Sequence, residues 1–233
     1  MILDGGPEAD IPGRVPVGDS LTHPLAEVLD GVGRGEYPDA DGSVRVLRQP
    51  NDRDCGVIAF TGHSVVFADV DPAWARGLLP GDDLSAPLNP PFLSALEKRT
   101  GRSVNNVDML VVAGPLAGPP PVSLTELADP DHPRVRRAVR HRDGVRVWRA
   151  EGGIVLLGRG VAGRWEIAVE VDPGYRGRGL GARLARAGRH LLGEGRVVWA
   201  QIAPGNAASV RAFLSAGFTP VGAEALLVPA ADV

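Results

Sequence analysis

From residue 43 onward, apolar and polar positions recur in patterns that predict a regular order of strands and helices. Short runs rich in Val and Ile predict strands, because β-branched side chains fit a pleated, half-buried surface. Apolar residues three and four positions apart predict helices with one buried side. The expected strands cover residues 43–49, 55–60, 64–70, 107–114, 145–150, 154–158, 165–171, 196–203 and 222–229, and the expected helices cover 72–79, 91–100, part of 131–144, 180–191 and 206–217.

Several of these elements are bounded by residues that commonly begin or end them. Gly62, in the segment TGH between the second and third strands, suits the tight turn of a hairpin. Gly101 is placed to end the second helix, while Asp131 and Asn206 are candidate N-terminal caps of later helices. The helix after residue 179 carries one apolar stripe, formed by Leu180, Leu184, Ala187 and Leu191.

The chain divides into three regions by composition. Residues 1–43 are rich in Gly, Pro and Asp and predict a loosely ordered N-terminal extension. Residues 44–105 predict a small α/β region, and a boundary is expected near Asn105. Residues 106–233 run through three meander-like strands and then alternate strand, helix, strand, helix, strand. This order is typical of an α/β layer fold.

Composition and charge exclude several classes of function. A net charge of −3 and a pI near 6.0 give no support to nucleic-acid binding. Cys55 is the only cysteine, so an intrachain disulfide and a multi-cysteine zinc site are both excluded, and no metal is expected. The first residues do not resemble a signal peptide, and no apolar run is long enough to cross a membrane. We therefore expect a cytoplasmic protein without a membrane partner.

The segment VDPGYRGRGLGARL, residues 171–184, concentrates glycine and arginine at a strand-to-helix junction. Gly177, Gly179 and Gly181 allow the backbone to turn sharply and to approach a ligand closely. The helix that begins there presents unpaired N–H groups at its positive end, which attract phosphate. Arg176 and Arg178 add positive charge that an anionic ligand would contact. The junction therefore predicts a binding site for a phosphate-bearing cofactor.

Residues 177–182 also match the dinucleotide pattern G-x-G-x-x-A, but their surroundings do not suit it. A dinucleotide site needs its first glycine directly after the strand, and here DPGYR intervenes. It also needs an acidic residue about 20 positions further on, where this chain has Gln201, Ile202 and Ala203. A nucleotide-dependent enzyme is therefore the weaker alternative.

The run VDPGYRGRGLG resembles the acetyl-CoA loop of the GNAT superfamily of N-acetyltransferases, with Arg176, Gly179 and Gly181 at the pattern positions. Downstream, NAASVRAFLSAGF resembles the second motif of that family, in which Asn206 opens a helix that ends in Gly217 and Phe218. The spacing and element order between the motifs agree with the family over roughly residues 106–230. As a pair, the motifs are specific.

The resemblance implies the GNAT fold, a mixed central sheet with helices on both faces, to which this chain adds an N-terminal α/β segment on the acceptor side. It also implies a V-shaped opening between two strands, where pantetheine lies against the backbone near Val169 and Val171. Its pyrophosphate would bind the backbone amides of the glycine-rich segment, with Asn206 nearby. That segment consists of Arg176, Gly177, Arg178, Gly179, Leu180 and Gly181. The implied reaction is direct transfer of acetyl from acetyl-CoA to a primary amine, without a metal.

Direct attack on a thioester needs a neutral amine, so a group must accept the amine's proton. On the strand WEIAVEV, Glu166 and Glu170 share one face by period two. A buried glutamate with a raised pKa could act as the base, directly or through a water. The family's early Glu on this strand matches Glu166. A bulge typical of the family would favour Glu170, and both residues could instead be solvent-facing charges.

Two departures from the family leave an alternative open. Phe213 stands where many members have a Tyr that protonates the leaving thiolate, and Gln201 stands where some have a Glu. The proton could come from Tyr175, Ser209 or water, or the thiolate could leave unaided because an ordinary thiol has a pKa near 8.5. The alternative is a non-catalytic, CoA-binding module of GNAT type. The sequence leaves open both the oligomeric state and the acceptor, which could be a small molecule or a peptide amine.

Overall fold

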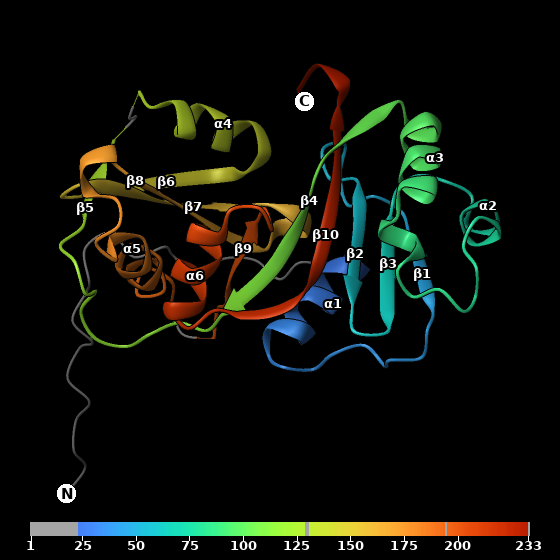
Figure 1. Cartoon of the computed structure of the whole chain (residues 1–233), viewed down its shortest axis with the longest axis horizontal. Helices are drawn as coiled ribbons and strands as arrows, with labels where there is room; N and C mark the ends of the chain where they lie inside the picture. The colour runs from blue at the N-terminus through green and yellow to red at the C-terminus, as the bar shows by residue number, and fades with distance from the viewer. Residues whose placement is uncertain (1–22, 129–130, 194, 233) are drawn as a thin grey trace, which may run out of the picture.

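A computed structural model describes residues 23–128, 131–193 and 195–232, and it contains one mixed ten-stranded sheet (Figure 1). The strand order is β1-β3-β2-β10-β4-β9-β8-β7-β6-β5. The pairs β1–β3 and β8–β9 are parallel and the other neighbouring pairs are antiparallel. The strands are β1 Val44–Leu47, β2 Gly56–Phe60, β3 His63–Phe67, β4 Arg102–Ala113, β5 Thr125–Leu127, β6 Asp143–Ala150, β7 Gly153–Arg159, β8 Trp165–Val171, β9 Val198–Ile202 and β10 Thr219–Pro229.

Six α-helices accompany the sheet in the described ranges, and the order of elements agrees with the α/β fold expected from the sequence. They are α1 Pro24–Gly33, α2 Pro72–Gly77, α3 Pro90–Thr100, α4 Pro133–His141, α5 Leu180–Gly188 and α6 Ala207–Ser215. Short 3₁₀ turns lie at Ala86–Leu88, Val161–Gly163, Pro173–Tyr175 and Ala230–Asp232. Within these ranges, no helix has the length and apolar character needed to span a bilayer.

The helices cover both faces of the sheet, as alternating strand residues show. On β4, Val111 packs in the core under α5 and α6, whereas Leu110 packs under α1. On β7, Val155 belongs to the α5 core and Ile154 to the core under α4. Because successive strand residues point to opposite faces, α1 and α4 lie on the face opposite to α5 and α6. The expected arrangement, a mixed sheet with helices on both faces, is confirmed.

Most of the expected elements form close to their expected limits. The β2–β3 hairpin turns through Gly62 at φ +65°, and Gly101 ends α3 in the left-handed conformation at φ +69°. Asn206 caps α6, since its side chain accepts a hydrogen bond from the backbone N–H of Ser209 at 3.1 Å. The apolar stripe of α5 is buried, although Leu191 lies just beyond the helix end.

The structure corrects two local expectations. In place of a loose extension over residues 1–43, Pro24–Gly33 forms α1, whose residues Leu25 and Leu29 are fully buried against the sheet; residues 1–22 lie outside the described ranges. The cap of α4 is His132 rather than Asp131, because the Nδ1 atom of His132 accepts from the Arg134 N–H at 3.2 Å. The sequence contains no recognisable pattern that predicts β5, a strand of three residues.

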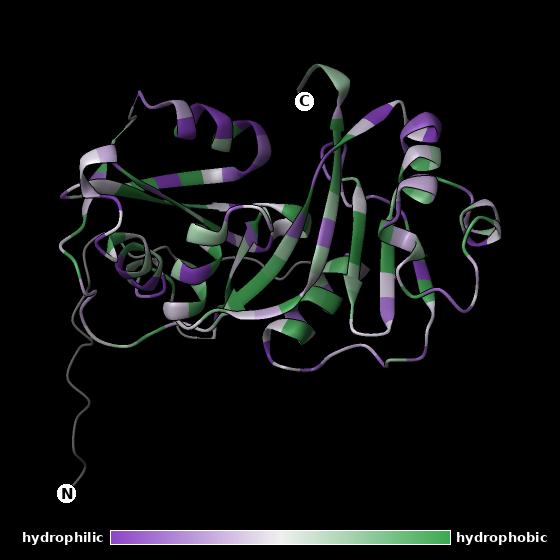
Figure 2. Cartoon of the chain, in the orientation of Figure 1, coloured by the Kyte–Doolittle hydropathy of each residue, from purple (hydrophilic) through white to green (hydrophobic). Residues whose placement is uncertain are grey.

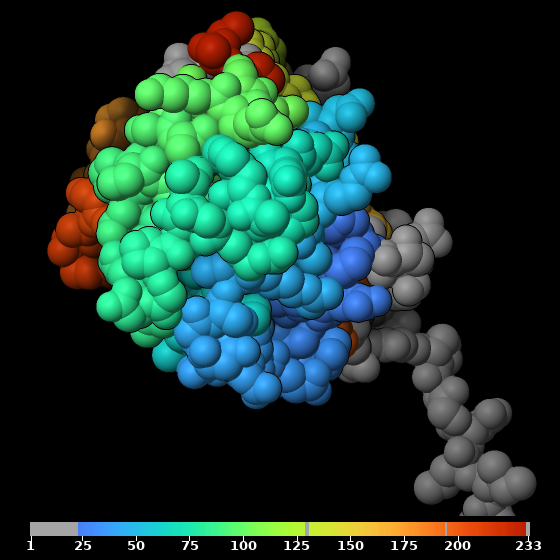
Figure 3. Space-filling view, turned by 90° about the vertical axis from the view of Figure 1, so that its right-hand side faces the viewer, coloured from blue at the N-terminus to red at the C-terminus, as the bar shows by residue number. Residues whose placement is uncertain are grey.

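The two expected regions share one sheet. The boundary expected near Asn105 lies inside β4, which pairs with β10 over residues 102–112 and so crosses that boundary. Residues of the first half of the chain, coloured blue to green, cover the end of the molecule seen in Figure 3. Hydrophobic residues are concentrated along the sheet and α1, whereas α4 is largely hydrophilic (Figure 2). The division into 44–105 and 106–233 therefore stays a prediction.

Candidate functional site

The strands β8 and β9 separate soon after they meet. Their register consists of a single pair, Glu166 with Trp199. Beyond this pair, a cavity of about 460 Å³ is lined by Ile167, Ala168 and Val169 of β8 on one side and by Gln201 to Ala203 on the other. Parallel neighbours that lose their pairing leave backbone N–H and C=O groups free to bind a ligand. This geometry is the V-shaped opening that the sequence resemblance implies.

The cavity extends to both faces of the sheet. On one face it reaches α6, where Asn206, Ser209 and Phe213 line it. On the other face it reaches α4, through Arg134, Arg137, Ala138 and His141. These α4 positions follow the i, i+3, i+4, i+7 spacing of one helix side. A molecule in the opening could therefore contact α6 with one end and α4 with the other.

The glycine loop lies at the end of β8 and is open to solvent. Gly177 has φ +75° and Gly179 has φ +74°, and a Cβ at either position would meet no atom within 4 Å. Gly179 is the N-cap of α5, so the first N–H groups of this helix are directed out of the loop. Arg176 and Arg178 are exposed, and the Arg176 Nε donates to the Val171 carbonyl at 3.2 Å.

Two contacts hold this open loop in place. The Asp172 N–H donates to the Gly152 carbonyl at 2.8 Å. The ring of Tyr175 packs on Gly152, where an added Cβ would lie 2.2 Å from the ring. Gly152 has φ +79° in the turn between β6 and β7, so both the space and the backbone conformation favour glycine there. The loop is thus anchored at its start, while its later amides remain open.

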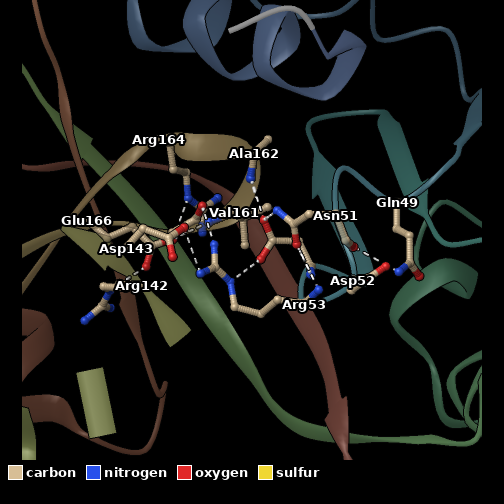
Figure 4. A network of polar contacts seen from close by, with 12 residues as sticks. Gln49, Asn51, Asp52, Arg53, Arg142, Asp143, Val161, Ala162, Arg164 and Glu166 are labelled. Atoms are coloured by element: carbon tan, nitrogen blue, oxygen red, sulfur yellow. Dashed lines mark hydrogen bonds and ion pairs between the residues drawn. The ribbon is translucent and has the colours of Figure 1, made fainter. Parts of the chain in front are cut away.

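Glu166 lies on the cavity side of β8 but is not the weakly held carboxylate that a base requires. Its side chain is 3 % exposed. Its Oε2 accepts from Arg142 Nε at 2.7 Å, and its Oε1 accepts from Arg164 Nε at 2.9 Å and Gln201 Nε2 at 3.2 Å. Gly160 packs against the carboxylate, leaving no room for a Cβ. Figure 4 shows Glu166 close to Arg142 and Arg164.

This environment changes the pKa of Glu166 in the direction opposite to the one expected. Burial alone would raise the pKa of Glu166, but the charges of Arg164 and Arg142 and their hydrogen bonds outweigh burial and lower it. The expectation of a raised pKa was therefore wrong, because the sequence did not indicate that two arginines would surround this carboxylate. Its assignment as the base stays a prediction.

Glu170, the alternative base, points to the same face of β8 but lies outside the cavity lining. The register of β8 with β7 has no shift, so no bulge changes which side chains face the cleft. The Glu170 carboxylate accepts from Arg134 Nε at 2.7 Å and is 35 % exposed. Thus Glu166, Val169 and Asn206 come together at the cavity, whereas Glu170, Val171 and residues 176–181 lie outside its lining.

Buried polar residues that the sequence analysis missed form a network behind Glu166. Arg164 is 2 % exposed and bridges Glu166 to Glu224, whose Oε2 accepts from Arg164 Nη2 at 2.6 Å and from Gln201 Nε2 at 2.9 Å. Burial raises the pKa of Glu224, against the charge of Arg164, and the neighbouring charge of Glu166 raises it further. A charged residue on an otherwise apolar strand, as Glu224 is on β10, was the available signal.

The first half of the chain supports the turn that precedes β8. Asp54 is buried, and its Oδ2 accepts from the Ala162 N–H at 2.9 Å. Ala162 has φ +49°, a conformation that is unfavourable for any residue with a Cβ. Arg53 donates to Asp54 at 2.9 Å and to Asp143 at 3.0 Å. The expected N-terminal segment thus reaches the cavity and holds a strained turn beside it.

The candidates for donating a proton to the leaving thiolate are separated. Ser209 belongs to the cavity lining, whereas Tyr175 does not. The hydroxyl of Tyr175 donates to Glu151 at 3.2 Å, and this hydrogen bond raises the pKa of Tyr175. Phe213 is buried and packs edge to face on Phe218, with ring centroids 4.9 Å apart. Of Ser209 and Tyr175, Ser209 is therefore the better placed to donate a proton to the leaving thiolate.

Comparisons with known proteins identify the family of the chain. The family model of the acetyltransferase (GNAT) family matches residues 128–218. N-alpha-acetyltransferase RimI of Mycobacterium tuberculosis is 31 % identical over 142 residues, which make up 60 % of this chain and 85 % of the relative. The resemblance found in the sequence is thereby confirmed, and with it an N-acetyltransferase activity that uses acetyl-CoA as co-substrate.

Two solved structures are also similar. The GCN5-related N-acetyltransferase from Kribbella flavida has 18 % identity and a TM-score of 0.39, with 59 % of this chain and 63 % of that chain covered. A putative GNAT acetyltransferase from Novosphingobium aromaticivorans has 24 % identity and a TM-score of 0.40, with 55 % and 66 % covered. From the family match and the curated relative, the chain belongs to the GNAT family of acetyltransferases.

Proposed function

We propose that this enzyme transfers acetyl from acetyl-CoA to the α-amino group at the N-terminus of a polypeptide. The observation that carries the proposal is the cavity between β8 and β9, which reaches both the α6 face and the α4 face. Acetyl-CoA would enter from the glycine loop, and the amine would approach from α4. The N-alpha-acetyltransferase RimI relative supports an α-amine as acceptor.

The residues of the loop suit the phosphates of acetyl-CoA. The open positions at Gly177 and Gly179 would let the pyrophosphate approach the backbone N–H groups that begin α5. Arg176 and Arg178 would add charge-assisted hydrogen bonds. The β8 backbone at Val169, in the cavity lining, and at Val171, just beyond it, would bind the pantetheine amides, with Asn206 at the start of α6 on the other side. When bound, acetyl-CoA supplies the thioester carbonyl that the neutral amine attacks: the C–N bond forms, the C–S bond breaks, and the proton lost from nitrogen reaches the thiolate through solvent.

The electrostatics of the cavity favour an α-amine over a lysine side chain. A carboxylate whose pKa is lowered, as at Glu166, is a weak base. An α-amino group has a pKa of about 7.7–8.0, so about a third of it is neutral at pH 7.5, whereas a lysine with a pKa near 10.4 is only about 0.1 % neutral. An α-amine therefore needs far less help from a base. Glu166 would then act mainly by positioning Arg142 and Gln201 at the cavity.

The leaving thiolate needs no tyrosine in this arrangement. A thiol with a pKa near 8.5 is a tolerable leaving group. The Ser209 hydroxyl, in the cavity lining, would donate a hydrogen bond to the sulfur. The metal-free reaction expected from the sequence suits these residues. The phenyl ring of Phe213 would then serve as an apolar wall of the cavity rather than as an acid.

The test compares two peptides of the same sequence. One has a free N-terminus and a blocked lysine, and the other has a blocked N-terminus and a free lysine. We expect acetylation, followed by mass spectrometry, on the first peptide only. The pH profile of kcat/KM should rise with an apparent pKa near 8, that of the acceptor amine. Acetylation of the lysine alone would contradict the α-amine acceptor. If the fall of kcat/KM at acid pH disappeared in Glu166→Gln, Glu166 would again be the candidate base.

A further inference from the structure

The acceptor end of the cavity, next to α4, contains more charged side chains than the rest of its lining. Three of its arginines are already paired within the protein. Arg53 pairs with Asp54, Arg134 with Glu170 and Arg142 with Glu166. Within each pair, the positive and negative charges neutralise each other. They therefore leave little charge available for a ligand.

Two other lining residues, of opposite charge, form no ion pair within the described part of the protein. The side chain of Arg137, on the cavity side of α4, forms no hydrogen bond or ion pair with any residue in the described ranges. Asp108, on β4, is half-buried, and its Oδ1 accepts from the Asn106 side chain at 2.7 Å. Its Oδ2 accepts no hydrogen bond from the described part of the chain. Both residues therefore have free capacity for a charged partner.

Asp108 and Arg137 border the same space from different sides. The charge of Arg137 acts on the carboxyl of Asp108, although no ion pair joins them. Burial raises the pKa of Asp108, and the Asn106 hydrogen bond and Arg137 oppose this shift. A half-buried carboxylate and a nearby unpaired guanidinium both become more stable when a ligand supplies the opposite charges. A ligand that carries an ammonium and a carboxylate would match both.

We propose that the acceptor carries a carboxylate close to its reactive amine, so that Asp108 binds the ammonium before transfer and Arg137 binds the carboxylate. The inference rests on the proposed acetyl transfer to an α-amine. For a polypeptide, it means an acidic side chain near the N-terminus; a free acidic amino acid has the same chemistry. The positive charge of Arg137, which lines the cavity, attracts an acidic acceptor and repels a basic one.

The experiment measures kcat/KM for peptides that differ only at the second residue, which is Asp, Asn or Lys. We expect the Asp peptide to exceed the Asn peptide by about tenfold or more, the effect of one charge-assisted hydrogen bond, and the Lys peptide to be slowest. Free glutamate is assayed in parallel to distinguish a free amino acid from a polypeptide. Asp108→Asn should raise KM for every α-amine acceptor at least tenfold.

Charge reversal at one position provides the sharper test. Arg137→Glu should invert the order, so that the Lys peptide becomes faster than the Asp peptide. Arg140→Glu is the matched control, because Arg140 is an exposed arginine of the same helix outside the cavity lining. It should keep the wild-type order. Circular dichroism and acetyl-CoA binding verify that each variant is folded.

The outcomes separate the two proposals. If all three peptides react equally and Arg137→Glu changes nothing, the carboxylate preference is wrong while the α-amine acceptor stands. If free glutamate reacts and no peptide does, the polypeptide acceptor is wrong while the carboxylate preference stands. If only polyamines or lysine side chains react, both proposals are wrong.

Discussion

The glycine loop at residues 176–181 and the buried polar network around Arg164 belong to the same functional region but are built in opposite ways. The loop is one segment that is exposed from Arg176 to Gly179, and Gly177 and Gly179 have open space around them. The network joins side chains from β8, β9, β10 and the segments before β6 and β8, and its central guanidinium is 2 % exposed. The loop depends on the backbone of one segment, whereas the network depends on the relative placement of several.

This difference predicts different responses to substitution. A change in the loop alters backbone conformation or charge where few atoms pack, so it should affect ligand binding more than stability. A change in the network leaves buried charges without partners, so it should affect stability first. The network is also incompletely paired, since Arg164 Nη1 and Glu224 Oε1 have no hydrogen-bond partner within the described residues. Loss of one member would therefore leave further buried polar atoms without partners.

The largest effect is expected for Arg164→Met. The substitution leaves Glu166 and Glu224 buried without their shared cation, which destabilises the protein by about 3–5 kcal/mol. Urea denaturation followed by circular dichroism measures the loss. The control is Arg34→Met, which removes an exposed pair with Glu36 and should leave the midpoint nearly unchanged. Equal midpoints for the two variants would contradict a structural role for the network.

The next effect concerns the loop. Gly179→Asp should weaken acetyl-CoA binding tenfold or more, because it brings a carboxylate to the place proposed for the pyrophosphate and disfavours the left-handed backbone. Isothermal titration calorimetry measures the affinity. Gly101→Asp is matched in backbone, since Gly101 is also left-handed in open space but lies at the end of α3. Only Gly179→Asp should change the affinity for acetyl-CoA. An equal change in both variants would contradict binding of the cofactor at the loop.

The smallest expected effect is a pair of opposite pH dependences. Glu166 has a lowered pKa in the folded protein, so its contribution to stability is present above the usual glutamate pKa and is lost as pH falls through the folded value. Glu224 has a raised pKa, so its contribution is full at low pH and is lost as pH rises through the folded value.

The variants Glu166→Gln and Glu224→Gln test these signs. Relative to the wild type, Glu224→Gln should become more stable as pH rises from 4 to 8. Glu166→Gln should become relatively more stable as pH falls below 5. Thermal melts across this range measure both differences. Parallel curves for the two variants would show that the two carboxylates share one environment, contrary to their different numbers of arginine partners.

The order of elements and the cofactor loop could be predicted because their signals are local. The alternation of apolar residues on β8 and the capping oxygen of Asn206 depend on neighbours in the chain, as do the glycines of the loop. Helix α1 was missed because its apolar residues follow a stretch rich in Gly and Pro, and its burial depends on the far face of the sheet. The position of β4 between β9 and β10 also follows from no local pattern.

By itself, the sequence determined the α/β order, the family and the glycine loop, since each depends on residues close together in the chain. It also placed Glu166 on the correct strand. Only the tertiary structure decided the state of that residue, because Arg142, Arg164 and Gln201 reach it from separate segments. The same holds for Asp108 and Arg137, which are brought to one cavity by β4 and α4. The pKa of a buried group depends on the charges that surround it in space, and sequence neighbours supply only some of them.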